Sequence, residues 1–411
     1  MNAQPLAGLR VLELGQVYNG PYCGLLLAAQ GARVIKIEPP GGEIIRRQAM
    51  SPGGASYSFL MLNADKLGVV LDLKNPRGRD LFLELVARSD VVLENFASGV
   101  LDRLALGWEV LHATNQRLIL ASGRGYRPGS AWERFGAMDF TVQAISGHME
   151  ITGFPDQPPV KAGATLCDML GSTHLFAAIL LALRDLERTG LGRPVEVAML
   201  DATFPALMAY SSPWLEHGID PGRTGNRHSV PGSAPYGIYP TRDGWVAIMC
   251  VTDAHWASFA RLTGDTELTG DTTLARQPGR HARRPWIDER TARWSAGLER
   301  STVLERLATA GVPCAPVRAL PDAVEDPYML EQGLLRWVDV EGRGRVRVLG
   351  SPIQLREPGA RQADLPPPSA PPRLGEHTAH VLAEVLGLDA AAQAELARAG
   401  AFGQPDAPPP V

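Results

Sequence analysis

Short apolar runs alternate with longer amphipathic stretches through the first two hundred residues. Six of the runs have the length and β-branched content of buried strands: 9–14, 33–38, 69–73, 90–94, 118–122 and 194–199. Helix signals lie between them, in an Ala/Leu-rich stretch that reaches Gln30 and stops at Gly31, and again at 76–88 and 169–186. Strands separated by helices need crossover connections, so the pattern predicts an α/β fold with a parallel sheet.

The second half of the chain is divided by stretches rich in glycine and proline. Helix signals over 202–215 lead into a Gly/Pro/Arg-rich segment, and later segments suggest a strand at 245–251, helices near 255–262 and 292–310, and a strand pair within 335–349. We therefore expect a first part of a large domain at 1–217, a linker at 218–235, a small domain at 236–315, and a linker and C-terminal part that returns to the large domain at 316–411. The proline-rich stretch 366–372 is typical of an arm, and 406–411 of a frayed end.

Composition narrows the function classes. The net charge is −4, from 40 Lys+Arg and 44 Asp+Glu, which argues against a nucleic-acid partner that is bound through a cationic surface. The longest apolar run, 175–183, is about half of the roughly 20 residues of a membrane span, and the first residues lack the features of a secretory signal. We expect a cytoplasmic protein with no membrane partner.

The cysteines and the familiar catalytic motifs exclude several kinds of site. The four cysteines are far apart and form no Cys-x-x-Cys pair, which predicts reduced thiols and no metal site: Cys23, Cys167, Cys250 and Cys314. The first βα turn lacks the Gly-x-Gly-x-x-Gly spacing of dinucleotide sites, so its Tyr18 and Asn19 are either turn residues or the wall of another pocket. Serine-elbow, zinc-protease and P-loop motifs are also absent. Nine histidines are scattered along the chain, and His228, which lies in a loop, is the strongest candidate among them for a catalytic role.

Asp168 lies where a glycine-containing turn meets the apolar stretch 169–186, and two interpretations are open. Its side chain could cap the helix, because a carboxylate oxygen accepts hydrogen bonds from free backbone amides. Alternatively, those amides could keep the carboxylate ionised, and an ionised, partly desolvated carboxylate is a competent nucleophile toward an activated acyl group.

Motifs in a fixed order over almost the whole chain favour the second interpretation. They include Leu6-x-Gly-x-Arg-Val-Leu-Glu13, Gly31-Ala-x-Val-Ile-Lys-Ile-Glu38, Leu71-Asp-Leu-Lys74, Val92-Leu-Glu-Asn-Phe96, Gly163-Ala-Thr-Leu-Cys-Asp-Met-Leu-Gly171, Val195-x-Val-Ala-Met-Leu-Asp-Ala202 and Gly311-Val-Pro-Cys-Ala-Pro-Val317. In these motifs the chain resembles the class III CoA-transferase family, which includes formyl-CoA transferase and carnitine CoA-transferase and to which α-methylacyl-CoA racemase is related.

The resemblance implies a Rossmann-like large domain, a smaller α/β domain and an interlocked homodimer. Coenzyme A would be a cosubstrate, no cofactor would be covalently bound, and the partners would be an acyl-CoA and a carboxylic acid. The family's acyl-accepting aspartate falls on Asp168, and its CoA contacts fall on Val17, Leu71, Leu73, Lys74, Asn95, Phe96 and Arg103. Cations and an apolar slot suit the phosphates and the adenine of CoA. Substrate-pocket candidates are Tyr18, Asn19, Met138, His228 and Tyr236; together with Tyr22 and Phe140 they suggest an acyl group larger than formate or oxalate.

Two departures from formyl-CoA transferase limit what is carried over. Pro39 stands where that enzyme has an arginine that contacts CoA, so a phosphate contact would have to come from elsewhere, with Arg46 and Arg47 as candidates. The run of glycines that closes over its active site is also missing, and 232–237 is the nearest substitute. The acyl specificity of formyl-CoA transferase is therefore not transferred to this chain.

The related racemase reaction needs two bases on opposite sides of the α-carbon. Met138 stands where racemases carry the histidine base, and a thioether moves no proton at neutral pH. The expected function is transfer of CoA from an acyl-CoA to a carboxylic acid through an aspartyl intermediate on Asp168. An α-methylacyl-CoA racemase or epimerase and a catalytically inactive acyl-CoA-binding protein remain the alternatives.

Overall fold

The computed structural model describes residues 4–48, 55–229, 232–355 and 366–403, so the end at 406–411 lies outside the described residues. The chain forms two compact units, one built from Met1–Ser146, Gly163–Pro205 and Pro327–Val411 and the other from Gly147–Ala162 and Ala206–Asp326. This division differs from the expected boundaries, because 147–162, 206–217 and 316–326 group with the second unit. Hydrogen bonds from Gly225 N to Gly153 O (2.9 Å) and between the hydroxyls of Tyr210 and Thr224 (2.7 Å) join the first two of these segments to 218–235, which also belongs to the second unit.

The first unit contains a six-stranded sheet in the order β3-β2-β1-β4-β5-β6. All five neighbouring pairs are parallel, which confirms the predicted parallel sheet. The strands are β1 (Arg10–Glu13), β2 (Arg33–Glu38), β3 (Lys66–Val70), β4 (Val91–Glu94), β5 (Ile119–Arg124) and β6 (Pro194–Ala198). The order reverses direction between β1 and β4, and open parallel sheets bind ligands at the carboxyl ends of strands beside such a point.

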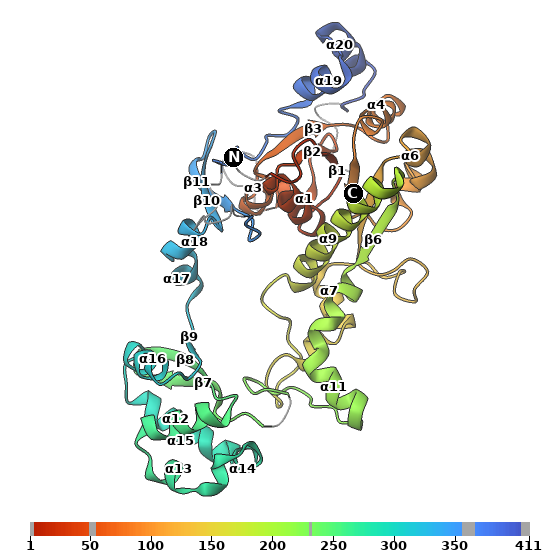
Figure 1. Cartoon of the computed structure of the whole chain (residues 1–411). Helices are drawn as coiled ribbons and strands as arrows, with labels where there is room; N and C mark the ends of the chain where they lie inside the picture. The colour runs from red at the N-terminus through yellow and green to blue at the C-terminus, as the bar shows by residue number, and fades with distance from the viewer. Residues whose placement is uncertain (1–3, 49–54, 230–231, 356–365, 404–411) are drawn as a thin grey trace. The chain divides into compact units, whose positions relative to one another are not determined.

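Helices cover both faces of this sheet (Figure 1). Alternate residues of the strands enter two separate apolar cores, so that Leu12 belongs to one and Val11 to the other. The helices α1 (Asn19–Ala29) and α9 (Leu166–Thr189) supply one core. The other core is supplied by α4 (Pro76–Val86), α5 (Val100–Arg103), α6 (Trp108–Thr114), α19 (Thr378–Leu386) and α20 (Ala390–Arg398).

The helix α9 is the one helix in the described ranges that is long and apolar enough to cross a membrane. It packs on α1, β5 and β6, and it carries the buried polar residues Asp168 and Ser172. The core helix of a globular unit can be as long and as apolar as a membrane-spanning helix. The contacts of α9 with α1, β5 and β6 are those of such a core helix.

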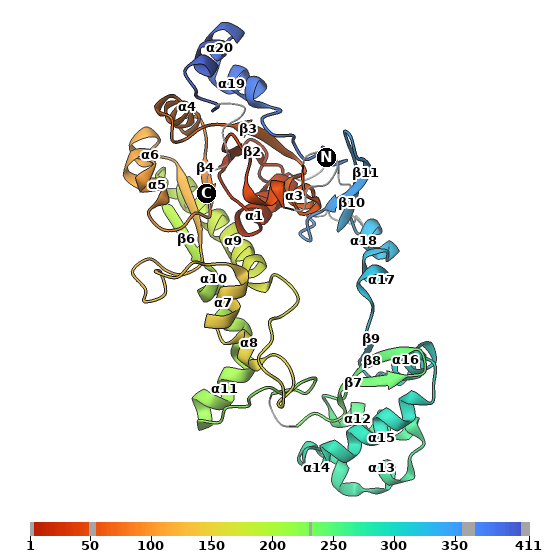
Figure 2. The same ribbon diagram turned by 180° about the vertical axis from the view of Figure 1, so that it is seen from behind.

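The late part of the chain closes the β3 edge of the sheet. The amide of Gly68 donates to His377 Nδ1 (3.1 Å), that of His377 donates to Gly68 O (2.9 Å), and Val70 N donates to Thr378 Oγ1 (3.1 Å). Figure 2 shows α19 and α20 in blue beside α4 and β3. Side chains and a helix thereby satisfy and cover an edge strand that would otherwise present unpaired amides.

Smaller elements complete the first unit. The predicted strand pair is confirmed as the antiparallel hairpin of β10 (Leu335–Val340) and β11 (Gly344–Leu349), which packs on α3 (Tyr57–Asn63). The remaining helices are α2 (Ile44–Arg47), α7 (Asp139–Ile145), α10 (Met199–Thr203) and α18 (Pro327–Glu331).

The second unit is a small α/β structure of its own. Its antiparallel sheet has the order β7-β8-β9, made of β7 (Tyr236–Thr241), β8 (Gly244–Met249) and β9 (Cys314–Pro316). Its α-helices are α8 (His148–Ile151), α11 (Met208–His217), α12 (Asp253–Thr263), α13 (Thr266–Gly270), α14 (Gln277–Ala282), α15 (Arg284–Ala296), α16 (Arg300–Thr309) and α17 (Leu320–Val324).

Three predicted elements need correction. The strand expected at 69–73 is β3, which starts at Lys66, because this lysine is buried against Glu13 and continues the strand instead of ending it. The helix expected over 202–215 is divided into α10, a 3-10 turn (Phe204–Leu207) and α11, with Pro205 in the turn. The helical stretch 292–310 is two helices, α15 and α16, separated at Gly297.

Candidate active site

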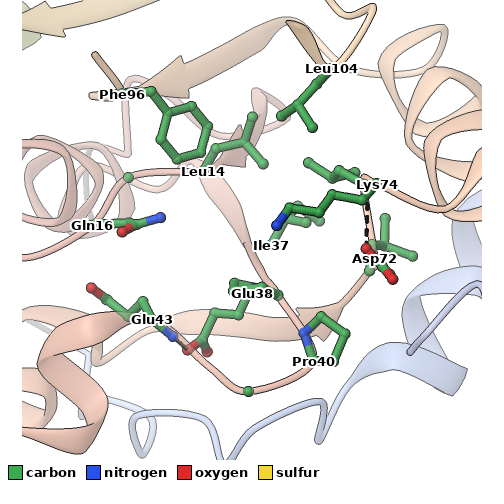
Figure 3. Close-up of a pocket in the computed structure, with 15 residues that line it drawn as sticks. Leu14, Gln16, Ile37, Glu38, Pro40, Glu43, Asp72, Lys74, Phe96 and Leu104 are labelled. Carbon is green, nitrogen blue, oxygen red and sulfur yellow. Dashed lines mark hydrogen bonds between the residues drawn. The ribbon is translucent and has the colours of Figure 1, made fainter. Parts of the chain in front are cut away.

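A cavity of about 320 Å³ lies at the carboxyl ends of β1, β2, β3 and β4. Its wall is mainly apolar, with a few charged groups (Figure 3). The lining residues are Leu14, Gly15, Gln16, Ile37, Glu38, Pro39, Pro40, Gly41, Glu43, Leu71, Asp72, Leu73, Lys74, Phe96 and Leu104. Position and composition fit a nucleotide-sized ligand with an apolar, planar part.

Four of the seven residues expected to contact CoA line this cavity, and they come from two segments. Leu71, Leu73 and Lys74 follow β3, and Phe96 follows β4. In Figure 3 the side chains of Phe96 and Leu104 lie on one side of the cavity, and the ammonium of Lys74 extends toward its middle. Lys74 is the only lysine or arginine among the described residues that line the cavity.

The other three expected CoA contacts lie outside the lining. Asn95 uses its amide group on the backbone of Gln16, accepting from Gln16 N (2.7 Å) and donating to Gln16 O (2.9 Å). Val17 packs beside the cluster of α3 and the β10–β11 hairpin. Arg103 is exposed at the end of α5, next to the lining residue Leu104.

Arg46 is not available as the replacement for the arginine missing at Pro39. Its guanidinium is buried, donates to both carboxylate oxygens of Glu38 (2.8 and 2.6 Å) and lies 3.8 Å from the ring centroid of Phe59. A bidentate, stacked arginine of this kind is committed to the fold. Arg47 is half-buried on the same short helix and stays a candidate.

Asp168 occupies the third position of α9, after Thr165 at the N-cap, so its side chain does not cap the helix. The cap is supplied from α7: Asp139 Oδ2 accepts from the backbone amides of Cys167 (2.7 Å) and Asp168 (3.2 Å). Gln143 donates to the other oxygen of Asp139 (2.5 Å) and fixes its orientation. The free amides that were expected to stabilise the Asp168 charge are therefore already occupied.

The Asp168 carboxylate is 9% exposed, and within the described ranges no group donates a hydrogen bond to it. Burial, and secondly the nearby charge of Asp139, raise the pKa of Asp168 to about 7. The expectation of an aspartate kept ionised by the helix start is therefore wrong. This carboxyl group titrates near neutral pH, in the range where strongly perturbed groups mark functional sites.

Asn19 connects Asp168 to the segment that follows β1. Its Nδ2 donates to Asp168 O (3.2 Å), and Ser172 Oγ lies within hydrogen-bond distance of the carbonyl oxygens of Asn19 (2.6 Å) and Asp168 (2.7 Å). Gly171 permits this approach, because a Cβ there would lie 2.5 Å from Asn19 Nδ2. Residues 15–19 thus join the cavity wall to the first turn of α9.

The remaining pocket candidates come from both units of the chain. Tyr18 is half-buried immediately before α1, and Met138 is 59% exposed at the N-cap of α7. His228 and Tyr236 belong to the second unit, where their rings meet edge to face with centroids 5.4 Å apart.

Comparison with known proteins decides the family. The model of CoA-transferase family III matches residues 6–378. The chain belongs to CoA-transferase family III. It is 36% identical to a succinyl-CoA:mesaconate CoA-transferase from Haloarcula hispanica, over 92% of this chain and 96% of the relative. It is 33% identical to a formyl-CoA:oxalate CoA-transferase from Streptomyces coelicolor, over 94% of this chain and 97% of the relative.

Solved structures agree with this membership. A CaiB/BaiF family protein from Brucella suis has a TM-score of 0.81 and 32% identity, covering 94% of this chain and all of that one. A hypothetical protein from Mycobacterium tuberculosis has a TM-score of 0.79 and 27% identity, covering 92% of this chain and all of that one. The family III CoA-transferase therefore has the fold of its relatives, and CoA as a cosubstrate fits the family.

Sequence reasoning overlooked several residues of this site. Asp139, Gln16, Glu43 and Lys36 had no assigned role, although Gln16 and Glu43 line the cavity. Asp139 acts on Asp168 across 29 positions of the chain. No local pattern predicts such a contact.

Proposed function

We propose that this family III CoA-transferase moves CoA from an acyl-CoA to a carboxylic acid through covalent intermediates on Asp168. The observation that carries the proposal is the buried carboxylate of Asp168, which accepts no hydrogen bond from the described residues and has a pKa raised to about 7 by burial and by Asp139. Asn19 connects it to the loop that lines the cavity of about 320 Å³. Desolvation makes a carboxylate a better nucleophile once it is ionised.

The chemistry proceeds in balanced steps. The Asp168 carboxylate attacks the thioester carbonyl, the C–S bond breaks, and a mixed anhydride and CoA thiolate result. The thiolate attacks the Asp168 carbonyl, which releases the donor acid and leaves an aspartyl-CoA thioester. The acceptor carboxylate then attacks this thioester, and the thiolate takes the acceptor acyl group from the second anhydride, which regenerates Asp168.

The binding roles follow from the residues of the cavity. Phe96, Leu104 and Ile37 offer apolar surface to the adenine, and Lys74 offers a cation to a phosphate. Arg103 and Arg47, both outside the lining, are the proposed sources of further phosphate contacts. The resemblance also supports a homodimer with interlocked chains and the remaining pocket assignments: Tyr18, Asn19, Met138, His228 and Tyr236.

Trapping the covalent intermediate tests the proposal. Incubation with an acyl-CoA and hydroxylamine is expected to convert Asp168 into its hydroxamate, detected by mass spectrometry of the peptide that contains it. Asp168→Ala is expected to lower transfer by at least about 10³-fold while CoA still binds. Glu187→Ala, which removes an exposed carboxylate of the same helix that pairs with Arg184, serves as the matched control and is expected to retain activity.

The substrates for this test come from the names of the relatives. These are named for succinyl, malate, mesaconate, oxalate and formyl substrates, so the panel starts with the CoA thioesters and free acids of those compounds and extends to larger acyl groups. Full transfer by Asp168→Ala would refute the role of Asp168. Deuterium entering the α-carbon from solvent, without CoA transfer, would instead identify a racemase.

A further inference from the structure

The loop between β1 and α1 contains a strained residue. Val17 has φ +63°, in the left-handed region that a β-branched side chain rarely adopts. Such a conformation costs of the order of 1–3 kcal/mol and persists only where neighbouring groups hold it. The loop also matters for the site, because Gly15 and Gln16 line the cavity and Asn19 donates to the backbone of Asp168.

Two side chains hold the peptide between Gln16 and Val17 at its two ends. Asn95 Nδ2 donates to the Gln16 carbonyl (2.9 Å), and the amide of Val17 donates to Glu43 Oε2 (2.8 Å). In Figure 3 Gln16 and Glu43 lie on the same side of the cavity. The direction of this peptide therefore depends on a carboxylate from the segment after β2.

Glu43 is itself fixed by buried charges. Lys36 Nζ lies 2.9 Å from Glu43 Oε1, and Glu38 Oε2 accepts from the Glu43 amide (3.1 Å). The same ammonium donates to Gly15 O (2.8 Å) and pairs with Glu13 (3.2 Å), so it contacts the loop directly. Burial opposes the charge of Lys36, yet Glu43 and Glu13 together raise its pKa above the ordinary value. The ammonium therefore stays charged across the working pH range.

We infer that Glu43, oriented by Lys36, is a positioning residue that holds the Val17 peptide in its left-handed conformation and thereby shapes the CoA cavity and aligns Asn19 with Asp168. The inference rests on the proposed CoA site. It explains why a β-branched residue is tolerated at a position where glycine would be unstrained: the peptide is held by groups that also form the pocket wall.

A pair of substitutions at position 43 separates positioning from charge balance. Glu43→Gln and Glu43→Leu both remove the charge that faces Lys36, but only Gln keeps an oxygen that can accept from Val17 N. Glu43→Leu is expected to raise the Kd for CoA about tenfold and to lower kcat, whereas Glu43→Gln raises the Kd by less than about threefold. Equal losses in both variants would show that only charge balance matters and would overturn the inference.

A double-mutant cycle with Val17→Gly tests the strain itself. Glycine adopts φ +63° without cost, so the loss caused by Glu43→Leu is expected to shrink to about twofold in the Val17→Gly background. An undiminished loss in that background would contradict the inference. If the unpaired charge of Lys36 prevents the Glu43→Leu protein from folding, the same variants are made in a Lys36→Met background. This substitution removes the unpaired buried charge.

The readouts keep this inference separate from the proposed function. Hydrogen exchange of the peptide that spans 14–22 is followed by mass spectrometry, and faster exchange of the Val17 amide is expected in Glu43→Leu but not in Glu43→Gln. This measurement and CoA binding need no transfer activity. A chain that binds CoA and shows this exchange pattern without forming an Asp168 adduct would keep the positioning role and lose the proposed chemistry.

Discussion

Asp168 and Asp139 form an unequal pair of carboxylates. Asp139 accepts two backbone amides and the amide of Gln143, whereas the Asp168 side chain receives no hydrogen bond from the described residues. Hydrogen bonds stabilise a carboxylate charge and burial without them opposes it. The pair therefore divides into a permanent helix cap and a group with a pKa raised to about 7, which is ionised only as the pH passes neutrality.

This division predicts a pH dependence of catalysis. In the proposed mechanism only the ionised form of Asp168 attacks, so kcat/KM is expected to rise as the pH passes through about 7 and then to level off. Asp139→Asn removes the like charge but keeps an oxygen that caps α9, so the midpoint is expected to move to lower pH while burial still holds it above the ordinary value for aspartate. The test is the pH profile of kcat/KM for both proteins, and an unmoved midpoint would contradict the coupling.

At the scale of elements, the site depends on the close approach of α1 and α9. Gly171 of α9 has Asn19 Nδ2 and Met199 Cγ at 2.5 and 3.0 Å from the position of an added Cβ. Alanine normally favours a helix over glycine by about 1 kcal/mol, but these neighbours leave no room for the methyl group. Packing, and not helix propensity, determines the residue here.

Gly171→Ala is therefore expected to destabilise the protein by about 1–3 kcal/mol, and to reduce transfer because Asn19 is displaced from Asp168. Gly136→Ala is a matched control, since an added Cβ meets nothing within 4 Å and the position lies outside the left-handed region. Thermal denaturation and transfer assays of the two variants provide the comparison. A Gly171→Ala protein as stable and active as the control would show that α1 and α9 adjust freely.

Some of these elements could be predicted from the sequence and others could not. The alternation of apolar runs was sufficient for the parallel sheet, because buried strands have a local signature. It was not sufficient for the start of β3, since Lys66 looks like a surface residue until Glu13 is seen beside it. The family motifs led to Asp168 and to four residues of the cavity wall, whereas the roles of Glu43 and Asp139 depend on contacts between distant segments that have no local pattern.

At the scale of the whole molecule, the cavity depends on the C-terminal segment. Leu71, Leu73 and Lys74 follow β3, whose edge is closed by residues around His377. The helix α19 anchors this segment, with Val381 and Leu382 fully buried in the same core as β3. Residues that contact no proposed substrate group thereby support the proposed CoA site.

Leu382→Ala tests this support. Deleting a fully buried leucine side chain is expected to cost about 2–5 kcal/mol and to weaken CoA binding as the β3 edge loosens. Leu374→Ala, which truncates a leucine of the same segment that is 39% exposed, is the control and is expected to lose much less. Denaturant unfolding and CoA titration measure the two effects. Unchanged CoA affinity in a clearly destabilised Leu382→Ala protein would show that the C-terminal segment does not support CoA binding.

The closure of β3 by residues near 377 also has a consequence for biosynthesis. Some three hundred residues separate the strand from the groups that cover it, so a ribosome must synthesise all of them before the edge strand β3 is protected. During that interval the nascent sheet presents open amides and an uncovered apolar surface to other chains. Chaperone demand should therefore peak late in translation, when the sheet is made and its cover is not.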